Sequence, residues 1–158
     1  MTKITFEQLL SAADSDGQTF ITQLHEYLLG KGCKAAFEEK KTSHLGSYKI
    51  GKPPKALINL LVRPQGVYVR IYGENVSHYM DFMQTIPAEM VTAIADSGDC
   101  GRLTKGTCSP KCTGYDVTIG GERYQKCRYC GFEFLMTEES RGFIKAFIEN
   151  EIGERAAK

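Results

Sequence analysis

The spacing of hydrophobic residues changes twice along the chain and divides it into helical and strand-like parts. Up to residue 30, apolar residues recur every three or four positions, which predicts helices over 3–13 and 18–30. The period then falls to two. This alternation predicts four strands, at 33–41, 44–51, 55–63 and 66–73. The turn sequence Arg63-Pro64-Gln65-Gly66 should join the last two strands into a hairpin.

Helical spacing returns in the second half of the chain. It predicts helices over 75–84 and 87–96, and Pro87 suits the first turn of the latter. A short strand is expected at 132–136, followed by a closing amphipathic helix over 137–154. The length of 158 residues fits one compact domain. We therefore expect a single α+β domain over 1–158, with an antiparallel sheet and flanking helices.

A cysteine-rich stretch, CSPKCTGYDVTIGGERYQKCRYCGF, interrupts this plan at 108–132. Apolar residues alternate on either side of Gly120-Gly121, and two glycines between alternating segments are typical of a β-hairpin turn. If the loop consists of these two glycines, facing residue numbers sum to 241, so Val117 faces Tyr124. Such a hairpin brings Cys112 close to Cys127, because neighbouring strands lie about 5 Å apart.

Paired cysteines on a hairpin predict a structural metal site, as in a zinc ribbon. The module at 100–131 contains five candidate ligands, of which four are needed: Cys100, Cys108, Cys112, Cys127 and Cys130. Cys100 and Cys130 compete for the fourth position. We expect zinc rather than an iron–sulfur cluster, because small structural four-thiolate sites most often hold zinc.

The segments GCKAAFEEKK, LINLLVRPQGVYVRIYG and GYDVTIGGERYQKCRY carry a resemblance that covers most of the chain from Gly32 onward. The chain resembles a family of small uncharacterised bacterial cysteine-containing proteins with the pattern DC-x7-C-x3-C-x14-C-R-Y. The matching cysteines are Cys100, Cys108, Cys112 and Cys127. The resemblance favours Cys100 as the fourth ligand and implies no particular activity.

A thiol-dependent redox enzyme is the alternative. Cys127 and Cys130 form a CxxC motif beside Lys126 and Arg128, and nearby cations can lower a thiol pKa. In thioredoxin-like proteins, however, the CxxC motif begins a helix, whereas here a strand-like segment follows. Structural disulfides are not expected in a reducing cytosol.

The net charge is +1, which gives no overall attraction to nucleic acid or membrane, but the charge is unevenly distributed. Residues 33–75 and 100–131 are basic, and basic residues alternate with tyrosines in the predicted sheet. This pattern suits phosphate contacts and base stacking. The candidate ligand-binding residues are Lys49, Lys52, Tyr68, Arg70 and Tyr72, and the same interleaved pattern includes Lys55, Arg63 and Tyr48. An ordinary solvated sheet face is the plainer interpretation.

The first residues, MTKITFEQLLSAADSDG, lack the apolar core of a signal peptide, and no apolar run is long enough to span a bilayer. We therefore expect a cytoplasmic protein with no membrane partner. No nucleophile elbow, P-loop or paired-carboxylate motif identifies catalytic residues. The sequence predicts a zinc-containing binding domain for a small anionic ligand or nucleic acid, and leaves enzymatic activity and oligomeric state open.

Overall fold

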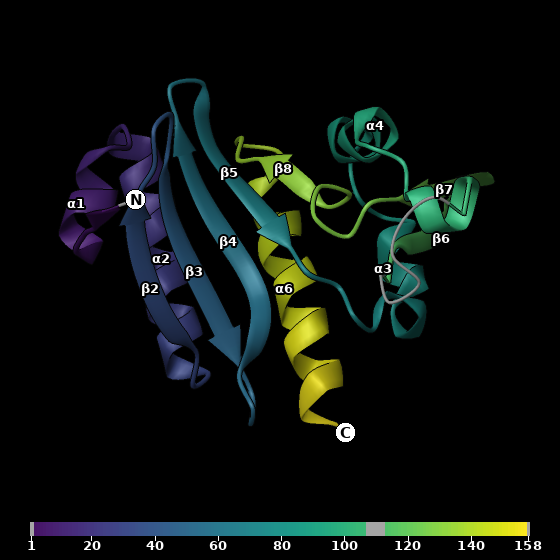
Figure 1. Cartoon of the computed structure of the whole chain (residues 1–158), viewed down its shortest axis with the longest axis horizontal. Coiled ribbons are helices and arrows are strands. Elements are labelled where there is room, and N and C mark those ends of the chain that lie inside the picture. Colours follow the sequence, from purple (N-terminus) through teal and green to yellow (C-terminus); the bar gives the residue numbers. More distant parts are fainter. Residues whose placement is uncertain (1, 107–112, 158) are drawn as a thin grey trace.

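A six-stranded antiparallel sheet forms the centre of the molecule (Figure 1). The computed structural model describes residues 2–106 and 113–157. From one edge to the other, the sheet consists of β1 (Thr2–Lys3), β2 (Lys34–Glu39), β3 (His44–Ile50), β4 (Lys55–Arg63), β5 (Gly66–Ile71) and β8 (Glu133–Leu135). Neighbours in the sheet are also neighbours in sequence except at β8, which returns to pair with β5 after the cysteine module.

Three helices cover one face of this sheet, and no helix of the described residues lies on the other face (Figure 1). The covering helices are α1 (Phe6–Ser11), α2 (Ser15–Gly30) and α6 (Arg141–Ala156). The remaining elements lie beyond β8, namely η1 (Val76–His78), α3 (Met80–Met83), α4 (Ala88–Asp96), α5 (Gly101–Thr104), β6 (Tyr115–Ile119) and β7 (Glu122–Lys126). Antiparallel sheets commonly have this one-sided arrangement, with one face packed and one face solvated.

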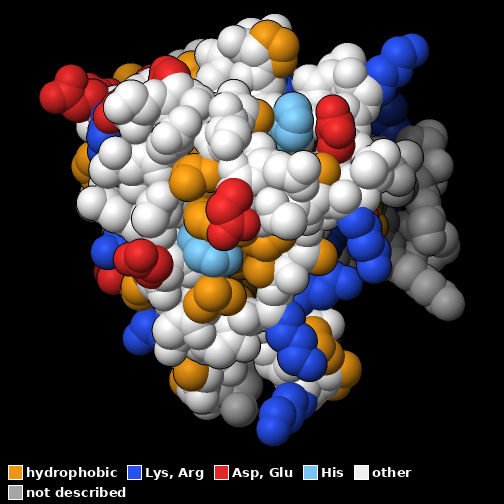
Figure 2. Space-filling model, turned by 90° about the vertical axis from the view of Figure 1, so that its left-hand side faces the viewer, with side chains coloured by type: hydrophobic (Ala, Val, Ile, Leu, Met, Phe, Trp, Pro, Cys, Tyr) orange, Lys and Arg blue, Asp and Glu red, His pale blue; other side chains and the backbone are white. Residues whose placement is uncertain are grey.

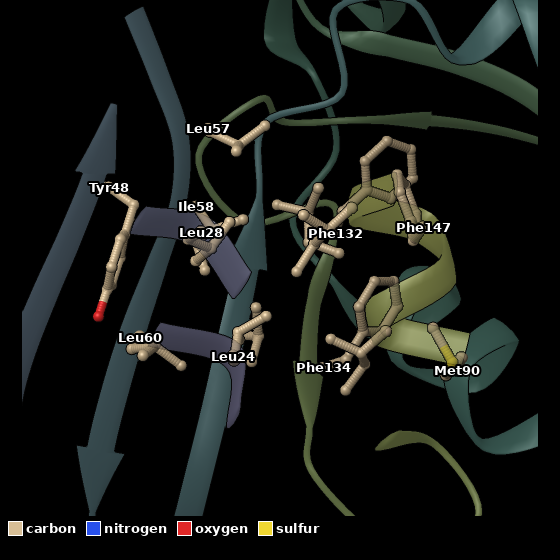
Figure 3. Packing of buried hydrophobic residues seen from close by; sticks show 14 of the residues in the cluster. Leu24, Leu28, Tyr48, Leu57, Ile58, Leu60, Met90, Phe132, Phe134 and Phe147 are labelled. Atoms are coloured by element: carbon tan, nitrogen blue, oxygen red, sulfur yellow. The ribbon is translucent and has the colours of Figure 1, made fainter. Parts of the chain in front are cut away.

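The core lies between the sheet and the covering helices. Leu24 and Leu28 of α2 point towards Ile58 and Leu60 of β4, and Phe147 of α6 meets the aromatic residues that lead into β8 (Figure 3). All of these side chains are at most 2% exposed. The apolar stripe predicted for the second helix is therefore the face that α2 buries, and Asp14 begins that helix by accepting a hydrogen bond from the Gly17 amide at 2.7 Å.

Alternation along β4 and β5 separates the two faces of the sheet. Val67, Val69 and Ile71 are buried beneath the helices, while Tyr68 and Arg70 lie on the opposite face and are partly exposed. This face of the sheet, which we call the open face, also carries alternate residues of β3, β4 and β8.

The α+β class, the antiparallel sheet and the flanking helices are confirmed, and all four predicted strands form. The sheet is larger than expected, because β1 and β8 add a strand at each edge. The helix expected at 75–84 consists instead of the short η1 and α3. The hairpin of β6 and β7 has the predicted register, with Val117 opposite Tyr124. Gly120 and Gly121 have φ angles of 60° and 87°, which glycine adopts readily.

Candidate functional site

The first candidate site is the part of the cysteine module that follows β7. Cys127 and Cys130 form a narrow turn in which the amides of Cys130 and Gly131 both bond to the Cys127 carbonyl, at 3.2 and 2.7 Å. The Cys127 amide bonds to the Gly98 carbonyl at 2.8 Å, so the turn is fixed to the segment after α4. Both thiols are partly exposed.

Cys100 lies on the segment beside this turn. Its amide bonds to the Gln125 carbonyl at 2.9 Å, and Asp99 pairs with Lys126 as an isolated antiparallel bridge. The Cys100 side chain is 2% exposed, and a β-carbon at Gly114 would collide with its sulfur. Cys100 therefore belongs to the packed part of the module, and a glycine at position 114 makes this close approach possible.

The predicted metal site is only partly within the described residues. Cys108 and Cys112 lie outside them. Within residues 2–106 and 113–157, no three His, Cys, Asp or Glu side chains gather closely enough to hold a metal ion. The zinc-ribbon interpretation therefore stays a prediction, as does the choice between Cys100 and Cys130 as the fourth ligand.

The basic residues beside the CxxC motif form structural contacts. The Lys126 ammonium donates to the carbonyls of Ala95 and Ser97 at 2.9 and 3.1 Å and to Asp99 at 2.9 Å. It thereby satisfies the C-terminal end of α4. The Arg128 guanidinium donates to Glu74 at 3.1 Å. Burial raises the pKa of the Cys130 thiol, which is the opposite of the shift that a redox-active thiolate requires.

The second candidate site is the open face of the sheet, where two of the predicted binding residues lie. Here Glu133 on β8 accepts from both neighbouring arginines: from Arg63 Nη1 at 2.9 Å, and from Arg70 Nη2 and Nε at 2.7 and 3.0 Å. The Arg63 guanidinium also lies over the Tyr68 ring, with its Cζ 4.7 Å from the ring centroid. Burial alone would raise the pKa of Glu133, but the hydrogen bonds from Arg63 and Arg70 outweigh it and lower that pKa.

The structure does not bring the five predicted binding residues together. Tyr72 is 6% exposed; its hydroxyl accepts from Asn59 at 3.1 Å, and Arg128 stacks over its ring. Lys49 is exposed at the end of β3, and Lys52 lies in the β3–β4 turn. Tyr68 and Arg70 share the middle of the open face, and the buried Tyr72 reaches the same face with its hydroxyl, beside Asn59 and Arg70.

Lys52 belongs to a different site, a pocket of about 1130 Å³. The pocket lies between the C-terminal end of α2, the β3–β4 turn and the C-terminal end of α6, which Figure 1 places at the same lower edge of the molecule. Its cationic lining residues are Lys31, Lys34, Lys52, Lys55 and Arg155. Figure 2 shows Lys and Arg side chains gathered towards this lower end.

The charges around this pocket are poorly balanced. Only Glu74 and Glu149 oppose the five cationic residues, and Glu74 is already bonded to Arg128. We call Lys31, Lys34, Lys52 and Lys55 the pocket lysines. Within the described residues, none of these four lysines forms an ion pair with a carboxylate.

The fifth cation, Arg155, is part of a buried network behind the pocket wall. Its Nε donates to Glu151 at 2.8 Å, and its Nη2 donates to the Tyr72 carbonyl at 2.7 Å. Glu151 is fully buried and also accepts from Asn75 at 2.9 and 3.1 Å and from Tyr79 at 2.5 Å. Burial, together with the carboxylate of Glu151, raises the pKa of the Tyr79 hydroxyl. This network fixes α6 to the segment that leaves β5.

Sequence reasoning found Lys52 and Lys55 of the pocket residues. The sequence Lys52-Pro53-Pro54-Lys55 signals an exposed turn with two cations. Lys31 and Lys34 flank a chain reversal after α2, and Arg155 lies more than 100 residues further along. Only the packing of α6 against the sheet brings these side chains to one cavity.

Comparison with known proteins provides no further identification. No protein-family model, curated protein or solved structure matches this chain. Among the helices of the described ranges, none is long and apolar enough to cross a bilayer.

Proposed function

We propose that this chain is a binding domain for a small anionic ligand, which occupies the pocket between α2, the β3–β4 turn and α6. One observation carries the proposal: the four pocket lysines face a single cavity without a carboxylate partner among the described residues. Like charges gathered around a concave, partly apolar surface produce a positive potential that attracts anions. A bound anion also relieves the repulsion between the lysines.

A small ligand fits these observations better than a nucleic acid. Nucleic acids need cations spread along a surface and free to contact successive phosphates. On the open face, Arg63 and Arg70 are already bonded to Glu133. The pocket lysines converge instead on one cavity, whose volume of about 1130 Å³ slightly exceeds the range of about 300–1,000 Å³ typical of small-molecule sites.

We propose in addition that the cysteine module contains a structural zinc ion, bound by four of Cys100, Cys108, Cys112, Cys127 and Cys130. The narrow turn at Cys127 and Cys130 and the adjacent, packed Cys100 support this proposal. A thiol-dependent redox enzyme using Cys127 and Cys130 is the alternative. It has less support, because Lys126 and Arg128 already donate to the carboxylates of Asp99 and Glu74.

Calorimetric titration with pyrophosphate tests the anion-binding function. We expect saturable binding that weakens as salt rises, because the lysines are near the surface and screened. The double variant Lys52→Ala/Lys55→Ala should lose this binding. Lys41→Ala, which removes an exposed lysine in the β2–β3 turn outside the pocket lining, is the matched control and should keep it. Equal binding by both variants, or no binding by the wild type, would refute the proposal.

Elemental analysis combined with thiol counting tests the zinc proposal. We expect about one zinc per chain, and thiols that become reactive only after chelation. The redox alternative predicts protein without bound metal and a Cys127–Cys130 pair that is oxidised and reduced reversibly.

A further inference from the structure

The same pocket has an apolar wall as well as a basic lining. Ile50, Pro53 and Pro54 contribute to it from the β3–β4 turn, and Ile152 and Ala156 contribute from α6. Ile152 is 8% exposed and packs into the main core, which makes this side of the pocket firm. An inorganic anion would leave the wall in contact with water, whereas a ligand with an apolar part would remove this surface from water.

The charge of the lining indicates which anionic group the pocket takes. Five cationic residues against two acidic ones give the lining a formal net charge of +3. A carboxylate carries one negative charge, whereas a phosphate monoester carries about −1.5 to −2 at pH 7. Lysine ammonium groups are compact point charges that bind phosphate through charge, whereas planar carboxylates gain most from the two parallel donors of an arginine fork. The pocket arginine, Arg155, already donates from Nε to Glu151 and from Nη2 to the Tyr72 carbonyl, so that only its Nη1 lacks a partner among the described residues and no free fork is left.

We propose that the ligand of this pocket is a phosphate monoester with an apolar body, a class that includes nucleotides and aryl or acyl phosphates. Its phosphate lies against the pocket lysines, and its body lies against the wall formed by the β3–β4 turn and α6. The proposal rests on the anion-binding function and adds to it the chemical class of the ligand. The pocket volume of about 1130 Å³ accommodates a ligand as large as a nucleotide.

A matched set of four small probes separates the two parts of such a ligand. Phenyl phosphate has both parts, inorganic phosphate and phenol have one each, and benzoate replaces the phosphate by a carboxylate. By calorimetry we expect phenyl phosphate to bind about 10- to 100-fold more tightly than inorganic phosphate, because burying an aromatic ring contributes that much. Benzoate should bind about tenfold more weakly than phenyl phosphate, and phenol should not saturate the protein.

Two substitutions assign these effects to the pocket. Ile50→Thr should weaken the binding of phenyl phosphate and leave the binding of inorganic phosphate unchanged, because it makes the wall polar without altering a lysine. Lys52→Ala should weaken the binding of both compounds, and Lys41→Ala, outside the pocket lining, should weaken the binding of neither. Amide chemical shifts of the wild-type protein provide a check that needs no variant: phenyl phosphate should shift the signals of residues 50–52, 55 and 152–156.

The outcomes distinguish this inference from the proposed function. If inorganic phosphate binds at the pocket as tightly as phenyl phosphate, the ligand class is wrong and the anion-binding function stands. If benzoate binds as tightly as phenyl phosphate, the preference for a dianion is wrong. If no anion binds, or if phenol binds as tightly as phenyl phosphate, both proposals fail. Replacing phenyl phosphate by adenosine monophosphate then tests whether the body is a nucleoside.

Discussion

The molecule has two groups of cationic side chains with opposite surroundings. On the open face, Arg63 and Arg70 share the half-buried carboxylate of Glu133, and Arg155 behind the pocket is bonded to the buried Glu151. The four pocket lysines have no such partner among the described residues. The number of basic residues alone does not distinguish these two groups. Their hydrogen-bonding partners show that the arginines mainly hold the fold together, while the lysines are available for an external anion.

The largest effect should come from breaking the buried pair behind the pocket. Glu151→Gln removes the charge that balances Arg155 in a water-excluded place, and we expect unfolding to become easier by about 3–5 kcal/mol. Urea denaturation measures this loss. Glu149→Gln, an exposed carboxylate on the same helix, should change stability by less than about 0.5 kcal/mol. A loss below about 1 kcal/mol for Glu151→Gln would show that this network is not structural.

Removing Glu133 should convert the paired arginines into free ones. Glu133→Ala should cost about 2 kcal/mol of stability, because charge-assisted hydrogen bonds to Arg63 and Arg70 are lost. The freed arginines should also make the open face attract polyanions, seen as later elution from a heparin column at low salt. Glu38→Ala is the control, because Glu38 of β2 also lies on the open face of the sheet. Unchanged elution of the Glu133 variant would contradict the comparison.

Acid should weaken the same arginine pairs. The pKa of Glu133 is lower in the folded protein than in the unfolded chain, so its contribution is complete above the unfolded pKa of about 4.3 and disappears as pH falls through the folded pKa. The stability difference between wild type and Glu133→Gln should thus be constant near neutral pH and shrink in acid. Urea denaturation at a series of pH values measures it, and a difference that persists in strong acid would contradict the assignment.

The smallest effect on stability should come from the pocket lysines. Lys52→Ala/Lys55→Ala should shift the free energy of unfolding by less than about 0.5 kcal/mol, because neither side chain has a carboxylate partner to lose among the described residues. A gain in stability would fit as well, since mutual repulsion is relieved. A loss above about 1 kcal/mol, measured by urea denaturation, would mean that these lysines also hold the fold together.

Local patterns predicted the elements of the fold, including the strand that became β8, but they did not predict β1 or the place of β8 in the sheet. Alternation identified β2 to β5, and Gly120-Gly121 identified the hairpin and its register, because each depends on residues close in sequence. β1 is only two residues long and has no readable period. The pairing of β8 with β5 joins segments on either side of the cysteine module, and no local pattern specifies such a long-range partner.

The candidate sites were predicted less completely for the same reason. The alternation of tyrosine and arginine in β5 correctly placed Tyr68 and Arg70 on one face. The carboxylate that neutralises Arg70, however, belongs to Glu133, which lies far along the chain. Tyr72 lies just beyond the strand, beneath Arg128, and is therefore buried. The pocket depends on α6 meeting the β3–β4 turn, and the spacing of residues in either segment does not encode this contact.

The late return of β8 has a consequence for how the chain folds. β5 and β8 cannot pair until residues 72–132 have been made and brought back to the sheet, so the last sheet contact closes a long loop. Loop-closure entropy grows slowly with length, by about 0.6 kcal/mol for each doubling. A cysteine module that folds early, with its ends drawn together, would shorten this loop in effect. Completion of the sheet thus depends on bringing together residues from either side of the module, such as Arg70 and Glu133.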